Sequence, residues 1–144
     1  MAQSVTKQSF GIDVSKDDFQ VYYSQRNSKF SFDPKSHKKF VSNAKGMQAF
    51  EAWIKSHLVK DVPMTMLMEA TGVYYEELAY FLRERGYALS VLMPTRTHHF
   101  ALSLNNGSKT DKIDARTLSQ MAIERDLLVW QIPNAKFLTI KRLT

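Results

Sequence analysis

The amino-acid sequence predicts an α/β fold in which a mixed β-sheet carries helices on both faces. Two observations support this prediction. The first part of the chain contains three strand-like segments separated by short polar turns, which is typical of antiparallel hairpins. The rest alternates helical patterns with short apolar runs, which is typical of parallel strands connected by helices. Together these parts predict one sheet that contains both strand directions.

The three antiparallel strands are expected within the first 32 residues. Residues 9–14 have the composition of a strand, and residues 19–23 alternate between apolar and polar side chains. Lys16-Asp17-Asp18 lies between them and suits a hairpin turn. Residues 29–32 predict a short third strand. We expect Asp33-Pro34 to end it, because proline cannot donate a hydrogen bond to a neighbouring strand.

Helices and buried strands are expected to alternate in the remainder of the chain. Apolar residues recur at helical spacing in residues 47–58, 74–85 and 94–102. Gly86 and Pro94 suit the end of the second of these helices and the beginning of the third. Short apolar runs occupy residues 64–68 and 88–93. Their shortness favours buried strands over helices.

A last helix is predicted after Asn105-Asn106-Gly107, which interrupts the preceding helical pattern. Ser108 is expected to cap this helix, with Asp111 as its capping-box partner three residues later. The apolar stripe of the helix consists of Ile113, Leu118, Met121 and Ala122.

Composition limits the classes of protein to which the chain can belong. With 144 residues, 44% of them hydrophobic and 24% charged, it has the size and composition of about one globular domain. Cysteine is absent, which excludes disulfides and thiolate metal ligands. No apolar run approaches the roughly 20 residues that span a bilayer, and no secretion signal is recognisable, so we expect a cytoplasmic protein without membrane contact.

We expect three regions along the chain. Residues 1–8 are polar and predict a flexible N-terminus, and residues 9–130 predict the folded domain. Residues 131–144 begin a new helical pattern, with Phe137, Ile140 and Leu143 at helical spacing. Because no other predicted element is left for this segment to pack on, we interpret it as the start of a helical linker to a further, C-terminal domain.

Four carboxylates are the candidate catalytic and metal-binding residues. Asp13 and Glu69 each close an apolar strand, and Asp111 and Asp114 are spaced to share one face of a helix. An isolated carboxylate at the end of a buried strand is costly without a partner. Oxygen-rich sites suit Mg²⁺ or Mn²⁺, and two such ions roughly 4 Å apart promote phosphodiester chemistry. Taken singly, each acid is more often a surface charge or a helix cap than a metal ligand.

The charge of the chain favours a polyanionic partner. The net charge is +6, and basic residues surround the candidate acids in the sequence. The candidate nucleic-acid-binding residues are Lys16, Arg96, Lys109, Lys112 and Arg116. Each of them is as compatible with a solvated surface charge as with contact to a phosphate.

Three segments together resemble a known family. They are Gly11-Ile12-Asp13-Val14-Ser15-Lys16, Met68-Glu69-Ala70-Thr71-Gly72 and Lys109-Thr110-Asp111-Lys112-Ile113-Asp114-Ala115-Arg116. Each motif alone is weak, but the ordered set resembles the N-terminal domain of the DEDD transposases of bacterial insertion sequences. That family includes the Piv-type DNA invertases and the bridge-RNA-guided recombinases. The resemblance covers about residues 9–125.

The resemblance implies a RuvC-like, ribonuclease H-like fold with Asp13, Glu69, Asp111 and Asp114 as its metal-binding tetrad. It also implies DNA as a partner, a guide (bridge) RNA as a further candidate partner, and a homo-oligomer for the complete protein. Members of the family carry a second, C-terminal domain with a serine proposed as the nucleophile. We therefore expect the chain alone to be inactive.

The leading functional hypothesis is the catalytic domain of a transposase or site-specific recombinase that cleaves and transfers DNA strands with divalent metal ions. One alternative is a stand-alone, structure-selective nuclease of the same fold, in which metal-activated water attacks. Another is a non-catalytic nucleic-acid-binding or dimerisation module. A sugar-kinase or actin-like ATPase is disfavoured, because the turn Val14-Ser15-Lys16-Asp17-Asp18 lacks the glycines of a phosphate loop.

Overall fold

The computed structural model describes residues 4–104 and 114–132. Its centre is a five-stranded sheet with the order β3-β2-β1-β4-β5. The strands are β1 (Val5–Val14), β2 (Asp18–Asn27), β3 (Phe32–Val41), β4 (Met64–Glu69) and β5 (Leu89–Leu92). The first three pair antiparallel, whereas β4 pairs parallel with β1, and β5 parallel with β4. The predicted mixed sheet with an antiparallel start is confirmed.

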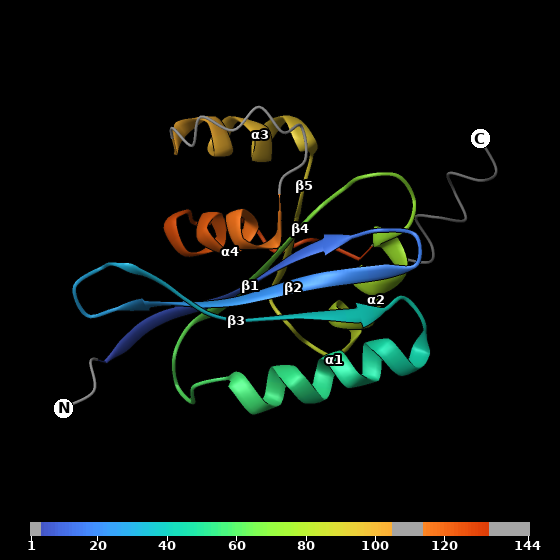
Figure 1. Cartoon of the computed structure of the whole chain (residues 1–144), viewed down its shortest axis with the longest axis horizontal. Coiled ribbons are helices and arrows are strands. Elements are labelled where there is room, and N and C mark those ends of the chain that lie inside the picture. Colours follow the sequence, from blue (N-terminus) through green and yellow to red (C-terminus); the bar gives the residue numbers. More distant parts are fainter. Residues whose placement is uncertain (1–3, 105–113, 133–144) are drawn as a thin grey trace.

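The helices cover both faces of this sheet, as the sequence predicts. They are α1 (Ala44–His57), α2 (Tyr75–Glu84), α3 (Pro94–Ser103) and α4 (Ala115–Glu124). Figure 1 shows α1 on one face of the sheet and α4 on the opposite face, with α3 beyond α4. In the described part of the chain, no helix has both the length and the apolar character that a membrane span requires.

Two apolar cores lie on the two faces, because successive side chains of a strand point to opposite sides. Ile12 of β1 and Met68 of β4 are fully buried in the core that includes Phe50 of α1. Leu67 of β4, one residue before Met68, belongs instead to the second core, with Leu118 of α4. Both faces of the central strands are therefore buried, which explains their unbroken apolar runs.

Helix α4 packs so closely on β1 that the backbones of the two elements touch. A Cβ atom at Gly11 would overlap the carbonyl oxygen of Ala115 and the backbone nitrogen of Ser119, so only glycine fits there. Small side chains complete the contact: the Ser9 hydroxyl donates to the Ser119 carbonyl at 2.8 Å, and the Ser24 and Ser119 hydroxyl oxygens are 2.8 Å apart. These contacts, which we call the seam, join Ser9, Gly11 and Ser24 of the sheet to Ala115 and Ser119 of α4. The seam fixes the first turn of α4 over the second half of β1.

The third strand differs from its prediction. Residues 29–32 were expected to form it and Asp33-Pro34 to end it, but β3 begins at Phe32 and continues to Val41. The prediction was wrong because β3 is an edge strand, where a missing N–H group is tolerated. Pro34 pairs opposite Ser24, beside a shift in the β2–β3 register. The lysines of this segment lie on the exposed edge, where charge discourages pairing with another sheet.

The sheet also begins earlier than predicted. Residues 1–8 were expected to be flexible, but β1 starts at Val5 and pairs with β2 from there. Side chains of this segment are held as well: the Thr6 hydroxyl donates to the Arg26 carbonyl at 3.1 Å, and the Gln8 amide donates to the Val59 carbonyl at 2.9 Å. The linker predicted in residues 131–144 lies outside the described residues from 133 onward and remains a prediction.

Candidate metal and nucleic-acid site

Asp13 and Glu69 lie side by side at the carboxyl ends of two neighbouring parallel strands. The β1–β4 register pairs Ile12 with Met68, and the two acids follow directly. Both side chains are half-buried. Because side chains alternate along a strand, Asp13 shares the face of Gly11, on which α4 packs, and Glu69 shares the face of Leu67. The two carboxylates therefore belong to the same corner of the molecule, on the side of α3 and α4.

The carboxylate of Glu69 is oriented by two hydroxyl groups. Thr97 of α3 donates to Oε1 at 2.5 Å, and Thr71 donates to Oε2 at 3.2 Å. Thr97 is fully buried, so the donor side of this charge-assisted hydrogen bond is out of contact with water. The contact is possible because the Ala70 amide donates to the Leu92 carbonyl at 2.8 Å, which brings the beginning of α3 next to the end of β4.

Thr97 is a residue of this corner that the sequence alone does not reveal. No motif includes it, and its spacing of three residues from Pro94 indicates only a position in the first turn of a helix. Its role comes from the packing of α3 beside β4, which a local pattern does not contain.

Asp114 is the N-cap of α4. Its backbone is extended, with φ −85° and ψ 170°, and its side chain accepts a hydrogen bond from the Thr117 amide at 2.8 Å. The helix was expected to begin at Ser108 and to carry both Asp111 and Asp114, but it begins at Ala115. That prediction was wrong for Asp114, because a carboxylate at this position satisfies a free amide of the first turn and so starts a helix. Asp111 lies outside the described residues.

The position of α4 brings Asp114 to the corner that holds Asp13 and Glu69. Ala115, the residue after Asp114, contacts Gly11, two residues before Asp13. The other end of the helix is held by Lys7, whose ammonium group donates to the carbonyl oxygens of Ile123 at 3.1 Å and Arg125 at 3.2 Å. Burial lowers the pKa of Lys7, although the carboxylate of Asp126 opposes this shift.

The donor atoms of this corner fit a hard divalent cation. Carboxylate and hydroxyl oxygens are the ligands that Mg²⁺ and Mn²⁺ prefer. Among residues 4–104 and 114–132, however, no three acidic or histidine side chains are gathered closely enough to hold a metal ion. The structure thus brings Asp13, Glu69 and Asp114 to one corner but does not place all three within coordinating distance of one ion.

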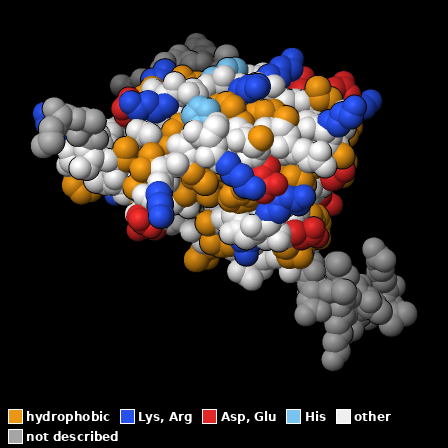
Figure 2. Space-filling view, turned by 90° about the horizontal axis from the view of Figure 1, so that it is seen from below, with side chains coloured by type: hydrophobic (Ala, Val, Ile, Leu, Met, Phe, Trp, Pro, Cys, Tyr) orange, Lys and Arg blue, Asp and Glu red, His pale blue; other side chains and the backbone are white. Residues whose placement is uncertain are grey.

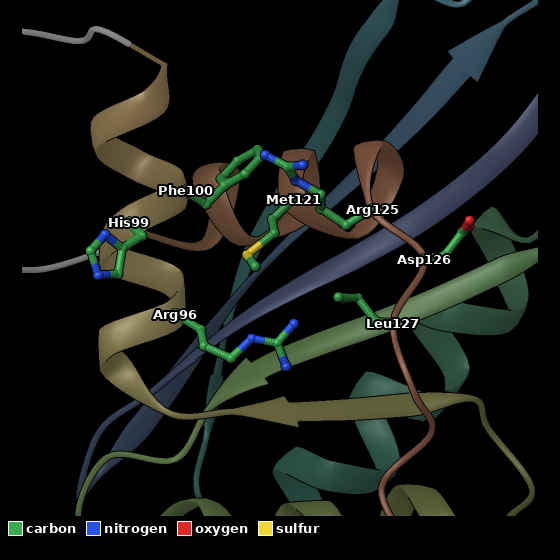
Figure 3. Close-up of a pocket in the computed structure, with 7 residues that line it drawn as sticks. All are labelled: Arg96, His99, Phe100, Met121, Arg125, Asp126 and Leu127. Carbon is green, nitrogen blue, oxygen red and sulfur yellow. The ribbon is translucent and has the colours of Figure 1, made fainter.

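The basic candidates lie at different distances from this corner. Lys16 is exposed in the turn after β1, three residues beyond Asp13, and Arg116 is exposed in the first turn of α4. Arg96 lines a hollow of about 370 Å³ together with His99, Phe100, Met121, Arg125, Asp126 and Leu127. Figure 3 shows the Arg96 side chain extending from α3 toward Leu127, with Arg125 beside Phe100. Lys109 and Lys112 lie outside the described residues.

The opposite side of the molecule carries charges of both signs (Figure 2). On the side that carries α1, Lys and Arg side chains alternate with Asp and Glu and with hydrophobic patches (Figure 2). The described basic candidates Arg96 and Arg116 instead belong to α3 and α4, on the side of the carboxylates.

Comparison with solved structures agrees with this topology. The structure of Thermus thermophilus RuvC superimposes with a TM-score of 0.55 at 12% sequence identity, over 85% of this chain and 99% of that one. The fold is therefore RuvC-like, in the ribonuclease H-like class, as the resemblance of the motifs implies.

Comparison of sequences gives the family. The pilin gene-inverting proteins of Moraxella bovis and Moraxella lacunata are each 28% identical over 127 residues, which cover 88% of this chain. The chain spans 38% of the length of these relatives. A family model described as a transposase, of the DEDD type, matches residues 10–144. This chain belongs to the DEDD transposase family.

Proposed function

We propose that this chain is the catalytic domain of a DNA transposase or site-specific recombinase, and that Asp13, Glu69, Asp111 and Asp114 bind two Mg²⁺ or Mn²⁺ ions. The observation that carries the proposal is the pair Asp13 and Glu69, adjacent at the ends of parallel strands and facing the helix that Asp114 caps. Carboxylates directed to one corner can share a divalent cation, which offsets their charge.

The bound ions would supply Lewis-acid activation of the attacking oxygen and stabilisation of the phosphoryl transition state. The residues of the chain supply the geometry. Asp13 and Glu69 are proposed as ligands from the sheet, and Asp114 as a ligand from α4, with Asp111 completing the set. Thr97 and Thr71 hold the Glu69 carboxylate in one orientation before any ion arrives.

DNA is the proposed substrate. The two curated relatives are named for inverting a pilin gene. Because this chain belongs to the same family, we propose a role in DNA recombination for it as well. Lys16, Arg96 and Arg116, together with Lys109 and Lys112, are proposed to contact phosphates. The attacking serine is expected from a C-terminal domain, and a homo-oligomer, a guide RNA and a cytoplasmic location belong to the same proposal.

A calorimetric titration of Mn²⁺ tests the metal site. Asp13→Asn keeps the size of the side chain but removes its charge, so the binding heat should disappear. The matched control is Asp17→Asn, an exposed acid in the neighbouring turn, which should bind as the parent chain does. Binding retained in Asp13→Asn would remove Asp13 from the site.

A cleavage assay separates the transposase proposal from its main alternative. If the chain alone cuts branched DNA in Mn²⁺, and Asp13→Asn does not, water is the attacking group and the chain is a nuclease in its own right. If the chain binds Mn²⁺ without cutting, the nucleophile must come from elsewhere, as the transposase proposal requires.

A further inference from the structure

A second hollow lies directly beside the proposed catalytic corner. Its volume is about 440 Å³, within the ~300–1,000 Å³ range that is typical of small-ligand pockets. It is lined by Gln20, Tyr22, His37, Asp114, Ala115 and Arg116. None of these residues except Asp114 and Arg116 has a part in the proposed function. We call it the β2–β3 hollow, after the two strands that form its floor.

The register of the sheet connects the β2–β3 hollow to the carboxylates. Gln20 of β2 pairs directly opposite Asp13 of β1, so the two side chains are neighbours on one face of the sheet. Asp114, the N-cap of α4, belongs both to the hollow and to the corner with Asp13 and Glu69. A ligand in the hollow would therefore adjoin whatever the carboxylates hold.

The floor of the hollow is aromatic. Tyr22 and His37 pair opposite each other in the β2–β3 register, with ring centroids 5.6 Å apart, and His37 Nε2 lies 2.9 Å from Gln20 Oε1. Tyr22 is half-buried and His37 exposed, whereas Phe19 and Phe40 of the same strands stack in the core. Packing of the core therefore explains the Phe19–Phe40 pair but not the Tyr22–His37 pair.

The wall of the hollow carries one guanidinium and one carboxylate, those of Arg116 and Asp114. Arg116 stands in the first turn of α4, with its guanidinium carbon 5.9 Å from the ring of Phe32. Lys39 pairs opposite Gln20 and so lies on the same face of the sheet, where its ammonium group is 3.2 Å from Asp18. An aromatic floor beside a guanidinium suits a nucleotide, because a base stacks on the rings while its phosphate meets the cation.

We propose that the β2–β3 hollow binds one unpaired nucleotide of DNA, next to the phosphodiester that the carboxylates hold. The location of the nucleotide on the strand rests on the proposed function, whereas its binding does not. An unpaired nucleotide is favoured over duplex because a base reaches the floor of a hollow only after leaving the stack, at a cost of a few kcal/mol in paired DNA. Stacking and a phosphate contact predict little sequence preference.

Fluorescence anisotropy with a labelled oligothymidine tests this proposal, in EDTA so that metal binding plays no part. Tyr22→Ala should weaken binding at least about fivefold, the effect of losing one stacked base. Tyr22→Phe keeps the ring and should bind as the parent chain does. Phe30→Ala is the matched control, because this aromatic side chain is 73% exposed at the far end of the same hairpin. Equal affinity in Tyr22→Ala and the parent chain would overturn the proposal.

Arg116→Gln tests the phosphate contact separately. It should reduce the slope of log affinity against log salt concentration by about one unit, because one fewer counterion is released. The same oligonucleotide paired with its complement should bind more weakly than the single strand, and Tyr22→Ala should remove this preference. An oligouridine of equal length that binds more tightly than the oligothymidine would assign the hollow to RNA and overturn the assignment to DNA.

Photo-crosslinking does not depend on the folding of a variant. An oligonucleotide carrying 5-iododeoxyuridine should crosslink to Tyr22 or His37, as mapped by mass spectrometry, and crosslinks confined to other segments would contradict the proposal. Failure here is distinguishable from failure of the metal site. If Asp13→Asn loses Mn²⁺ binding but no crosslink to Tyr22 or His37 forms, the proposed function stands and only the nucleotide site is refuted. If the crosslink forms but Asp13→Asn still binds Mn²⁺, the nucleotide site stands and the proposed metal site is refuted.

Discussion

The hydrogen bond between Thr97 and Glu69 is the contact at single-residue scale that bears most directly on the proposed chemistry. A carboxylate at the end of a strand can rotate, and each orientation presents different lone pairs to a cation. The buried Thr97 hydroxyl restricts Oε1, and Thr71 restricts Oε2. Partners of this kind orient metal ligands and commonly affect affinity as strongly as a ligand does.

We predict that Thr97→Val weakens Mn²⁺ binding by about 10- to 100-fold, the usual effect of removing a group that orients a ligand. Valine has nearly the same shape, so the loss of the hydrogen bond to a charged group should lower the free energy of unfolding by only about 1.5–3 kcal/mol. Calorimetry and urea unfolding measure the two effects. Thr95→Val, at an exposed position of the same helix, should change neither. Unchanged Mn²⁺ affinity in Thr97→Val would show that Glu69 needs no such support.

Gly11 has a purely steric role that also concerns the site. We predict that Gly11→Ala lowers the free energy of unfolding by about 1–3 kcal/mol or more, because the added methyl group meets backbone atoms of α4 that cannot move aside. Gly86→Ala is the comparison: nothing lies within 4 Å of a Cβ there, and its φ of +84° alone should cost about 1–2 kcal/mol. Urea unfolding of both variants measures the difference. Only Gly11→Ala should also weaken Mn²⁺ binding, since it displaces Asp114 from Asp13.

At the scale of elements, α4 determines whether the candidate site exists. It is fixed at its first turn by the Asp114 cap, along its length by the seam with β1, and at its last turn by Lys7. Asp114 therefore has a structural role in addition to its proposed role as a metal ligand. The two roles depend on different properties of the side chain, because capping needs an oxygen acceptor whereas cation binding needs charge.

Two substitutions at Asp114 separate these roles. Asn is as good an N-cap as Asp, so Asp114→Asn should leave thermal stability nearly unchanged while it abolishes or strongly weakens Mn²⁺ binding. Asp114→Ala removes the cap as well and should lower the free energy of unfolding by a further ~1 kcal/mol. Thermal unfolding and calorimetry on the same samples measure both quantities. An Asp114→Asn variant that binds Mn²⁺ normally would restrict Asp114 to capping.

The elements that the sequence predicted well are those in which local pattern and tertiary position agree. The apolar run of β4 is buried on both faces, so its composition alone identifies it. The prediction for β3 failed because the effect of Pro34 depends on its edge position, which no local pattern reveals. The start of α4 was misplaced because Ser108 and Asp114 are both good N-caps. Thr97 could not be selected, since its only signal is a contact between two elements.

At the scale of the whole molecule, the mixed sheet explains why distant acids meet. Parallel pairing of β1 with β4 places residues 13 and 69 at the same edge of the sheet, and the seam at Gly11 adds residue 114 from the other end of the domain. The same face continues over β2 and β3, where α4 leaves the β2–β3 hollow uncovered. The proposed catalytic corner and the proposed nucleotide site therefore share one continuous surface.

The open arrangement of the acids leads to a prediction about stability. A cation that binds only the folded chain stabilises it by mass action. At a Mg²⁺ concentration 100 times its dissociation constant, the gain is about 2.7 kcal/mol, which should raise the melting temperature by several degrees. Asp13→Asn should not respond to Mg²⁺. Asp17→Asn should respond fully. An equal response to Mg²⁺ in all three proteins would mean that the ion acts through general screening of charge and not at this corner.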